Sequence, residues 1–238
     1  MTQDPTSLSG KVLVVGGASG QVGGAVVRYA LEAGARVAIA VRKSWQVEKT
    51  TAQFGTKSVL VGCVPDVDGE AAAGFAKGAN DALGPIDALL CCNGAFAASE
   101  IGRDSTGDLQ DLMTANLFAV ANLARAMVGS MKQRRLGSIV CVGSAGVGLG
   151  GAGVANYLAS KAALHEWVRA LAAELVGTGV RAAAIVPSTI DTPSNRAAMP
   201  GADTSQWVPM DVVVRAMFAA AFAPVGSGPL YPVPRSTS

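Results

Sequence analysis

Charged residues are scarce in this chain, at 15% of 238 residues, against about a quarter in an average globular protein. The net charge is only +2, and neither a basic tail nor a long Lys/Arg run is present. A nucleic-acid partner is therefore not expected, because such proteins concentrate basic residues on one face. Half of the residues are hydrophobic, which excludes a disordered chain and predicts a single domain over residues 1–238 with a large core.

Histidine and cysteine are also rare, with one His and four Cys. No two cysteines form a C-x-x-C pair, so His165 has too few partners for a zinc site and no metal is expected. Free thiols in a reducing cytosol are the simplest interpretation. The polar first ten residues lack the apolar core of a signal peptide, and the uncharged run 138–160 holds six glycines. The sequence therefore predicts a cytoplasmic protein without a membrane partner.

Short β-rich runs alternate with helical patterns along the whole chain. Strands are expected at residues 11–15, 36–41, 58–61, 87–92, 138–142, 180–186 and 230–233, and helices at 21–33, 44–54, 68–83, 109–134, 156–176 and 210–222. The strands are apolar throughout, as in a sheet covered on both faces. Because such alternation forms right-handed βαβ units, the sequence predicts an α/β class. The expected architecture is a three-layer, doubly wound Rossmann fold with a seven-stranded, mostly parallel sheet.

A glycine-rich turn separates the first predicted strand from the first helix, with the pattern G-x-x-G-x-x-G. Glycines let the backbone approach a pyrophosphate, and the helix N-terminus supplies free N–H groups and a positive dipole end. A turn that only packs helix on strand is the alternative, and no P-loop Gly-Lys-Ser/Thr follows. The turn predicts a dinucleotide site that includes Gly17, Ser19, Gly20, Gln21, Val22 and Gly23.

The end of the second predicted strand carries Arg42 and Lys43, where many dinucleotide folds place an acid for the ribose hydroxyls. An arginine there suits the 2′-phosphate of NADP, so NADP(H) is the predicted preference, with NAD(H) possible. Asp66 and Val67 follow the third strand and are expected at the adenine edge. A capping role for Asp66 on the next helix is the alternative.

Tyr157 and Lys161 are four residues apart at the start of a predicted helix and share one face of it. Ser144 lies upstream at the end of the fifth strand, and the carboxyl ends of strands are where α/β sheets bind ligands. A neighbouring ammonium favours a phenolate and lowers the tyrosine pKa, which fits proton transfer to or from a carbonyl oxygen. Spacing alone is also compatible with a surface Tyr/Lys pair.

These motifs together resemble the short-chain dehydrogenase/reductase family, over residues 9–233. Tyr157-x-x-x-Lys161 with Ser144 upstream matches its catalytic pattern, and Asn116 matches its helix asparagine, which orders a water for proton relay. The resemblance implies an oxidoreductase that interconverts a small carbonyl and an alcohol by hydride transfer, with Tyr157 as general acid and base. It also implies cofactor contacts from Asp66, Val67, Asn93, Gly94, Tyr157, Lys161, Pro187, Ile190 and Thr192.

The chain departs from the family pattern at three cofactor positions. The glycine spacing differs from the usual T-G-x-x-x-G-x-G, and Pro187-Ser188 stands where P-G is usual. Cys91-Cys92-Asn93-Gly94 replaces the usual N-N-A-G, so the side-chain hydrogen bonds of those asparagines are lost. None of these departures touches the four catalytic positions.

A narrower resemblance links residues 183–207, with Asp191 to Pro200 and Trp207, to the quinonoid dihydropteridine reductase branch. That branch generally lacks the catalytic serine and carries an acid after the second strand, unlike Ser144 and Arg42 here. A dihydropteridine-reductase-like activity is therefore the alternative within enzymes. A dinucleotide-binding sensor or scaffold without catalysis is the alternative from another class, and the complete set of four catalytic residues argues against it.

The connection over residues 189–207 is predicted to be a substrate lid. It is long for a link that follows a strand, and Pro193, Pro200 and Gly201 prevent one regular helix. Thr192 is expected to meet the nicotinamide carboxamide, as the family pattern implies. The helices 109–134 and 156–176 are rich in small residues and predict a homo-oligomer, a tetramer or a dimer.

His165 lies one helical turn beyond Lys161. A nucleophile–base pair of Ser144 with His165 would need a buried acid and an oxyanion hole. The pair of Tyr157 and Lys161 explains Ser144 better, so His165 is given no catalytic role.

Overall fold

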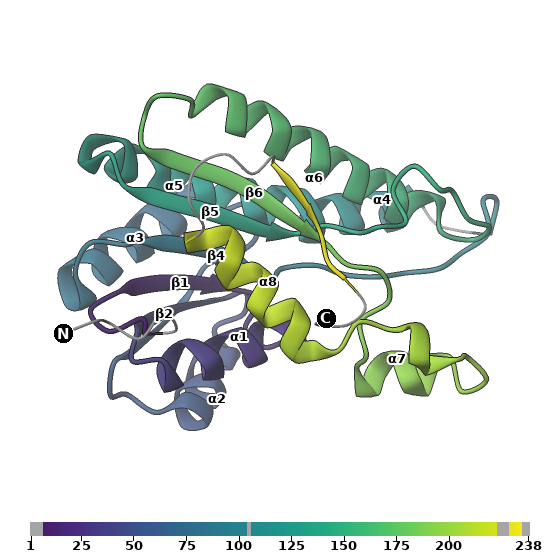
Figure 1. The fold of residues 1–238 in the computed structure, drawn as a ribbon, viewed down its shortest axis with the longest axis horizontal. Coiled ribbons are helices and arrows are strands. Elements are labelled where there is room, and N and C mark those ends of the chain that lie inside the picture. Colours follow the sequence, from purple (N-terminus) through teal and green to yellow (C-terminus); the bar gives the residue numbers. More distant parts are fainter. Residues whose placement is uncertain (1–6, 104–105, 223–228, 235–238) are drawn as a thin grey trace.

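The structure, a computed structural model, describes residues 7–103, 106–222 and 229–234. Its strands are β1 (Val12–Gly16), β2 (Arg36–Val41), β3 (Val59–Cys63), β4 (Ala88–Cys91), β5 (Gly137–Val142), β6 (Val180–Val186) and β7 (Leu230–Pro232). They form one seven-stranded sheet in the order β3-β2-β1-β4-β5-β6-β7 (Figure 1). Every neighbouring pair is parallel. The predicted doubly wound Rossmann fold is confirmed.

Helices cover both faces of the sheet (Figure 1). One face carries α3 (Gly69–Leu83), α5 (Ala119–Arg134) and α6 (Ala155–Glu174), and the other carries α1 (Gln21–Glu32), α2 (Trp45–Phe54) and α8 (Met210–Phe222). Successive residues of β1 belong to different cores. Val12 and Val14 pack toward α3 and α5, whereas Leu13 and Val15 pack toward α1 and α8. Because both faces are covered, every position in the strand is apolar.

The long predicted helix 109–134 is interrupted in the structure. It begins as α4 (Thr106–Met113), passes through a π-helical turn, η1 (Thr114–Phe118), and continues as α5. In the described part of the chain, this helix from Asp108 to Arg134 is the one long and apolar enough to cross a membrane by length and composition. It packs on the sheet as a core helix, with Val120, Leu123 and Met127 almost fully buried.

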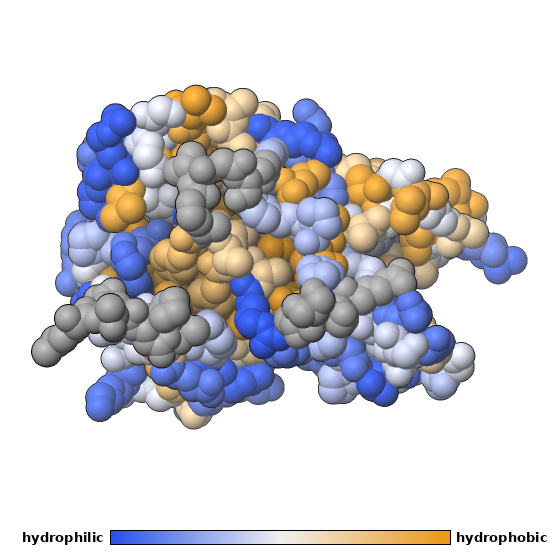
Figure 2. All heavy atoms as spheres, viewed as in Figure 1, coloured by the Kyte–Doolittle hydropathy of each residue, from blue (hydrophilic) through white to orange (hydrophobic). Residues whose placement is uncertain are grey.

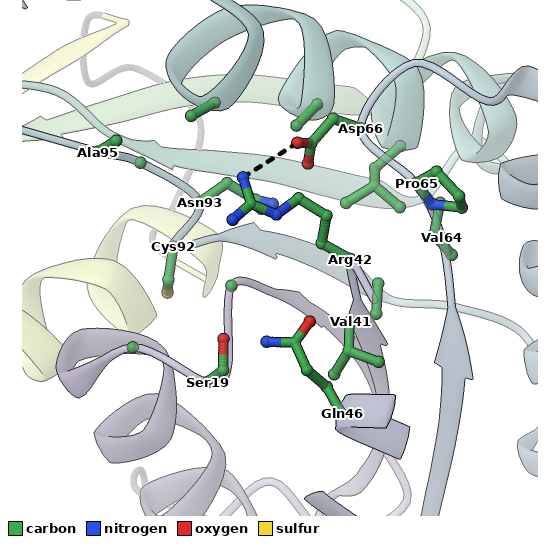
Figure 3. A pocket seen from close by; sticks show the side chains of 17 residues that line it. Ser19, Val41, Arg42, Gln46, Val64, Pro65, Asp66, Cys92, Asn93 and Ala95 are labelled. Carbon is green, nitrogen blue, oxygen red and sulfur yellow. Dashed lines mark hydrogen bonds and ion pairs between the residues drawn. The ribbon is translucent and has the colours of Figure 1, made fainter. Parts of the chain in front are cut away.

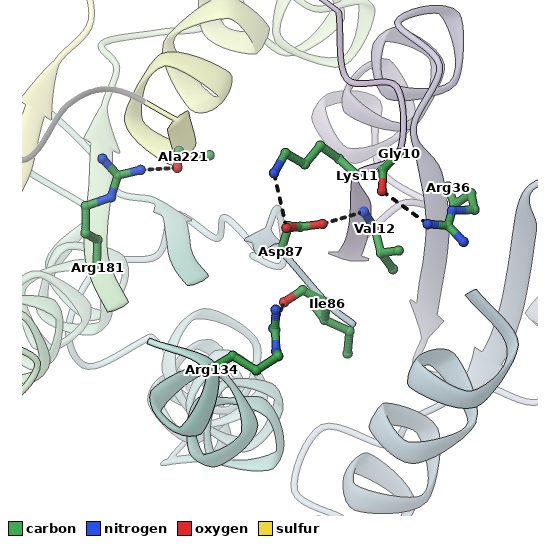
Figure 4. A network of polar contacts seen from close by, with 9 residues as sticks. All are labelled: Gly10, Lys11, Val12, Arg36, Ile86, Asp87, Arg134, Arg181 and Ala221. Atoms are coloured by element: carbon green, nitrogen blue, oxygen red, sulfur yellow. Dashed lines mark hydrogen bonds and ion pairs between the residues drawn. The ribbon is translucent and has the colours of Figure 1, made fainter. Parts of the chain in front are cut away.

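Polar contacts tie together the amino ends of the strands (Figure 4). Asp87 accepts hydrogen bonds from the backbone N–H of Val12 at 2.9 Å and from Lys11 Nζ at 3.3 Å. Arg134 and Arg181 donate to the carbonyls of Ile86 and Ala221. This end of the sheet is therefore fixed by structural contacts, while the predicted functional residues gather at the opposite, carboxyl end.

Candidate active site

The sheet order brings three functional segments to one edge. Gly16 at the end of β1 pairs with Cys91 at the end of β4, and Cys91 pairs with Cys141 near the end of β5. Because these parallel strands are neighbours, the glycine turn, the loop 92–95 and Ser144 follow from adjacent strand ends. Brought together in this way, they build the kind of crevice in which open α/β sheets bind ligands.

A pocket opens beside the glycine turn (Figure 3). The predicted residues that line it are Gly17, Ser19, Gly20, Arg42, Asp66, Asn93 and Gly94. Sequence reasoning missed the others, which are Ala40, Val41, Gln46, Val64, Pro65, Cys92, Ala95, Ala115, Ala119 and Leu123. Val41 and Val64 lie at or just after the carboxyl ends of strands, and this position could have identified them as pocket residues. No sequence pattern identifies the helix residues Ala115 and Leu123 as pocket residues, because only the packing of their helix on the sheet brings them to the pocket.

The glycines of the turn are required by close backbone contacts. Gly17 has φ +74°, and a Cβ there would lie 2.6 Å from the backbone nitrogen of Asn93. A Cβ at Gly23 would lie 2.3 Å from the carbonyl oxygen of Gly17, so Gly23 packs the helix on the turn. Helix α1 begins with Gly20 as its N-cap and no side-chain cap, which leaves N–H groups of its first turn for an anion.

The pocket also contains an unsatisfied buried acceptor. Asn93 Oδ1 is buried and has no hydrogen-bond partner. A buried acceptor in this state costs about 1–3 kcal/mol, which a donor from a bound ligand would offset. The glycine cradle, the uncapped helix start and this amide all suit a dinucleotide, whose pyrophosphate is anionic and whose ribose hydroxyls are donors. The residues present therefore fit NAD(P).

Arg42 and Asp66 face each other across the pocket mouth (Figure 3). Arg42 Nη1 lies 3.3 Å from Asp66 Oδ2, and the side chains are 56% and 13% exposed, respectively. The cap of α3 is Asp68, whose carboxylate accepts from the N–H of Ala71 at 2.9 Å. The alternative that Asp66 caps this helix is therefore wrong. Val67 is exposed and lies outside the pocket lining.

The other predicted cofactor residues lie outside the lining of this pocket. Gln21 Nε2 donates to Ser194 Oγ at 2.9 Å, and Val22 packs against the core on the α1 side. Thr192 Oγ1 accepts from the N–H of Asn195 at 3.1 Å and so caps the short helix α7 (Pro193–Ala198). Pro187 and Ile190 follow the end of β6, and the carbonyl of Pro187 accepts from the N–H of Ala145 at 2.9 Å.

Tyr157 lies in the first turn of α6, close enough to the Ser144 side chain for that side chain to affect the pKa of the phenol. Burial raises the pKa of Tyr157, and the Ser144 side chain lowers it by less, so the net direction is upward. The expected decrease in this pKa is therefore wrong, because desolvation of the phenolate outweighs the stabilising contacts. Ser144 Oγ also accepts from the N–H of Gly146 at 3.2 Å, which fixes the hydroxyl beside the phenol.

Lys161 is 4% exposed, and its Nζ donates to the carbonyl of Val142, the last residue of β5, at 2.9 Å. Burial lowers the pKa of Lys161 to about 8, with a smaller opposing effect from Cys141. The ammonium is thus held at the strand end next to Ser144 by a fixed carbonyl.

Asn116 lies in the π-helical turn η1, a local irregularity that is frequent at functional sites. Its Nδ2 donates to Ser160 Oγ at 2.8 Å, and its Oδ1 accepts from the N–H of Ala95 at 2.9 Å. A Cβ at Gly94 would lie 2.9 Å from Asn116 Oδ1 and 3.3 Å from Lys161 Nζ. Because Gly94 also lines the pocket beside the glycine turn, this pocket adjoins the buried end of Lys161.

Two further rings lie next to this site. Phe96 is 67% exposed and meets Tyr157 edge to face, with ring centroids 4.9 Å apart. His165 Nε2 accepts from the backbone N–H of Ser144 at 3.2 Å. The histidine therefore contacts the serine backbone, while the serine hydroxyl accepts from the N–H of Gly146, which is not the geometry of a nucleophile–base pair.

The segment 189–207 contains two short helical turns, and a β-bridge joins its two ends. Ile190 forms a β-bridge with Val208, and the segment holds α7 and a 3-10 turn, η2 (Thr204–Gln206), neither of which was predicted. Arg196 binds Asp191 at 2.6 Å on the exposed side. Helix α7 has no buried residue, whereas Trp207 is only 7% exposed. The described residues contain no group of three or more His, Cys, Asp or Glu that could hold a metal.

Comparison with known proteins places this chain in an enzyme family. Residues 11–202 match the profile of the family described as short chain dehydrogenase. The chain is 31% identical over 186 residues to acetoacetyl-CoA reductase of a Synechocystis species, which covers 78% of this chain and 74% of the relative. It is 30% identical over 187 residues to glycine betaine reductase ATRR of Emericella nidulans, covering 78% of this chain but only 15% of that protein. The crystal structure of gox2181 superposes with a TM-score of 0.85 at 26% identity, covering 97% of this chain and 96% of the other.

Proposed function

This chain belongs to the short-chain dehydrogenase family and is an NAD(P)-dependent oxidoreductase that interconverts carbonyl and alcohol groups, and we propose that Tyr157 is its general acid and base. The position of Tyr157 beside the Ser144 side chain, which acts to lower the pKa of the phenol, carries this proposal. It places a proton donor beside a second hydroxyl at the carboxyl edge of the sheet, next to a buried ammonium. We propose Asn116, Ser144 and Lys161 as its partners in catalysis.

The proposed chemistry assigns each side chain a separate task. Bound NADPH or NADH supplies the hydride. Ser144 and Tyr157 both hydrogen-bond the substrate oxygen, and Tyr157 gives it a proton as negative charge develops there. Lys161, whose pKa is about 8, is mostly an ammonium at neutral pH and stabilises the phenolate that remains. Asn116 binds the backbone of Ala95 through both ends of its amide, and so fixes the position of the dinucleotide pocket relative to Tyr157. The same residues work in reverse for alcohol oxidation.

A preference for NADP(H) over NAD(H) is proposed from Arg42. Its guanidinium is 56% exposed at the mouth of the pocket and is paired with one carboxylate, that of Asp66. A 2′-phosphate carries more charge than a carboxylate and offers bidentate acceptors, so it would replace Asp66 as the partner of Arg42. The residues directly after β2 are Arg42 and Lys43, so this position offers no acid to bind the ribose 2′-hydroxyl of NAD(H).

The proposed substrate is a small carbonyl or alcohol compound with an apolar group next to the reacting carbon. The exposed ring of Phe96 lies against Tyr157, where such a group would be covered. The loops that follow β4 and β5 form a protruding end of the molecule, at the right in Figures 1 and 2, and hydrophobic residues gather there. The acetoacetyl-CoA reductase relative makes 3-oxoacyl compounds the first to screen. Quinonoid dihydropteridine belongs in the same panel because of the resemblance of residues 183–207.

A homo-oligomer, tetramer or dimer, is also proposed. The outward face of α6 carries the small exposed residues Ala159, Ala162 and Ala170, which allow close approach of a second helix. Sedimentation velocity of the purified chain measures this state directly.

The Tyr157→Phe substitution tests the proposed function. We expect kcat to fall at least 100-fold, because general acid catalysis contributes about 10²–10⁴ and Phe cannot donate a proton. The dissociation constant of NADPH, measured by fluorescence titration, should stay within twofold. Tyr29→Phe is the matched control, since Tyr29 packs on Phe218 away from the site, and it should keep the activity. Near wild-type turnover by Tyr157→Phe would contradict the proposal.

A further inference from the structure

Helix α6 holds the end of β5 at two points one helical turn apart. Lys161 Nζ donates to the carbonyl of Val142 at 2.9 Å, and His165 Nε2 accepts from the N–H of Ser144 at 3.2 Å. Tyr157, Lys161 and His165 are spaced by four residues, so they project from one side of the helix. Helix α6 therefore carries the proposed acid Tyr157 and also fixes the backbone of Ser144.

The contact of His165 with this backbone is close enough to exclude a side chain. A Cβ at Gly143 would lie 2.3 Å from His165 Nε2, which is much shorter than van der Waals contact. His165 itself is 3% exposed. The imidazole ring is thus packed directly on residues 143–144 and has little room to move.

We propose that His165 is a positioning residue: its neutral ring holds the backbone of Ser144 so that the hydroxyl meets Tyr157, and its protonation releases that backbone and lowers the rate. This inference rests on the proposed catalytic role of Tyr157 and Ser144. It assigns no proton transfer with the substrate to His165.

The hydrogen-bonding capacity of imidazole explains the switch. The neutral ring accepts at Nε2 when its proton is on Nδ1, but the imidazolium is a donor at both nitrogens. In the charged form, Nε2–H would face the N–H of Ser144, and the hydrogen bond is lost. Two donors would then point at each other in a buried place, so the backbone must shift. A displacement near 1 Å at a catalytic group costs about 10²-fold in rate.

The surroundings of His165 favour the neutral ring at neutral pH. Burial lowers the pKa of His165 below its usual 6.5, and the positive charges of Arg169 and Lys161 on α6 lower it further. The other ionisable groups on described elements packed against α6 are Cys141 on β5, Arg181 on β6, and Asp108 and Asp111 on α4. Arg181 is engaged with Ala221 at the far end of the sheet. The hydrogen bond is therefore present near pH 7 and is lost as the pH falls through a value below 6.5.

The single histidine of the chain makes a direct test possible. In untagged, uniformly ¹⁵N-labelled protein, we expect the Nδ1–H tautomer of His165 and a titration midpoint below 6.5. The amide resonance of Ser144 should shift with the same midpoint. An Nε2–H tautomer, or a Ser144 amide that does not follow the histidine, would overturn the proposal without reference to activity.

Two substitutions test the effect on the rate. Gln keeps an acceptor, so His165→Gln should keep kcat within about threefold and lose the acidic limb of the kcat profile. Leu has no acceptor, so His165→Leu should lower kcat at least tenfold at pH 7 with the NADPH dissociation constant unchanged. Val168→Ala is the control, because Val168 is buried in the same helix and packs in the hydrophobic core on the side of α3 and α5. It should lower stability but keep the wild-type pH profile.

The outcomes separate the two proposals. If Tyr157→Phe abolishes turnover while His165→Leu is folded and fully active, only the positioning role is wrong. If His165→Leu fails to fold, the profile of His165→Gln decides: an acidic limb that persists in it overturns the inference. If Tyr157→Phe remains active, the proposed function fails, and the NMR titration still tests the contact with Ser144.

Discussion

At the scale of single residues, Lys161 shows what the site costs in stability. Its ammonium is almost fully buried, and burial lowers its pKa from 10.5 to about 8. The unfolded lysine therefore binds a proton more tightly than the folded one. Burial of Lys161 therefore lowers the free energy of unfolding by the full amount below pH 8, and this destabilisation decreases as the pH rises from 8 toward 10.5. The shift corresponds to roughly 3 kcal/mol.

Lys161→Met should therefore stabilise the protein at pH 7 while it removes activity. Methionine is similar in length and uncharged, but it loses the hydrogen bond to Val142, which is worth about 1 kcal/mol. We expect a net gain of about 1–2 kcal/mol at pH 7 that disappears near pH 10, measured by urea unfolding. Lys132→Met, an exposed substitution on α5, should show no such dependence on pH. A variant that is less stable at pH 7, or a gain that does not change with pH, would disprove this.

At the scale of elements, most of the proposed chemistry lies on helices that follow strand ends. Helix α6 supplies Tyr157 and Lys161, and the irregular turn η1 supplies Asn116. Lys161 is hydrogen-bonded to the end of β5, and Asn116 is hydrogen-bonded to the loop 93–95. The segment 189–207 differs, because its short helix α7 buries no residue and touches the rest of the described chain through contacts such as Gln21 with Ser194.

We predict that residues 189–207 act as a substrate lid whose α7 part orders on ligand binding. Elements with few buried contacts open at low free energy, so their amides exchange quickly. Hydrogen exchange in this segment should slow at least tenfold with NADPH and a substrate analogue bound. Trp207 and Val208 are buried and bridged, so they should be protected in both states. Equal exchange of α7 with and without ligands would show that the segment is structural only.

At the scale of the whole molecule, the sheet has one end built for stability and one for binding. The amino end is cross-linked by contacts such as that of Asp87 with Val12, and the carboxyl end holds the pocket with its unsatisfied Asn93 Oδ1. A ligand that binds only the folded chain stabilises it in proportion to its occupancy. The stability of the molecule is thus expected to depend strongly on which cofactor is present.

NADPH should raise the melting temperature at lower concentration than NADH does. Saturation at 100 times the dissociation constant adds about 2.7 kcal/mol. A charge-assisted contact of Arg42 with the 2′-phosphate is worth about 1.5–3 kcal/mol, so roughly tenfold more NADH should be needed for the same shift. Arg42→Ala should remove this difference, and Arg28→Ala, on the exposed side of α1, should keep it. Equal shifts by the two cofactors in the unchanged protein would refute the preference.

Local patterns were sufficient to predict most of the helices and strands. The strands β2 and β6 and the helix α8 lie at their predicted residues, because apolar runs and helical spacing depend on near neighbours in the chain. The spacing of Tyr157 and Lys161 likewise places them on one helix face whatever surrounds them. The π-helical turn η1 and the helices α7 and η2 were missed, since tertiary contacts override weak local preferences there.

By itself, the sequence determined the order of strands and helices, the glycine turn and the identity of the residues that meet at the sheet edge. Only the tertiary structure decided how they interact. Burial reversed the expected pKa change of Tyr157, Asp68 took the capping role considered for Asp66, and His165 met the backbone of Ser144 and not its hydroxyl. These outcomes depend on desolvation and on distances between residues far apart in the chain, which no local pattern encodes.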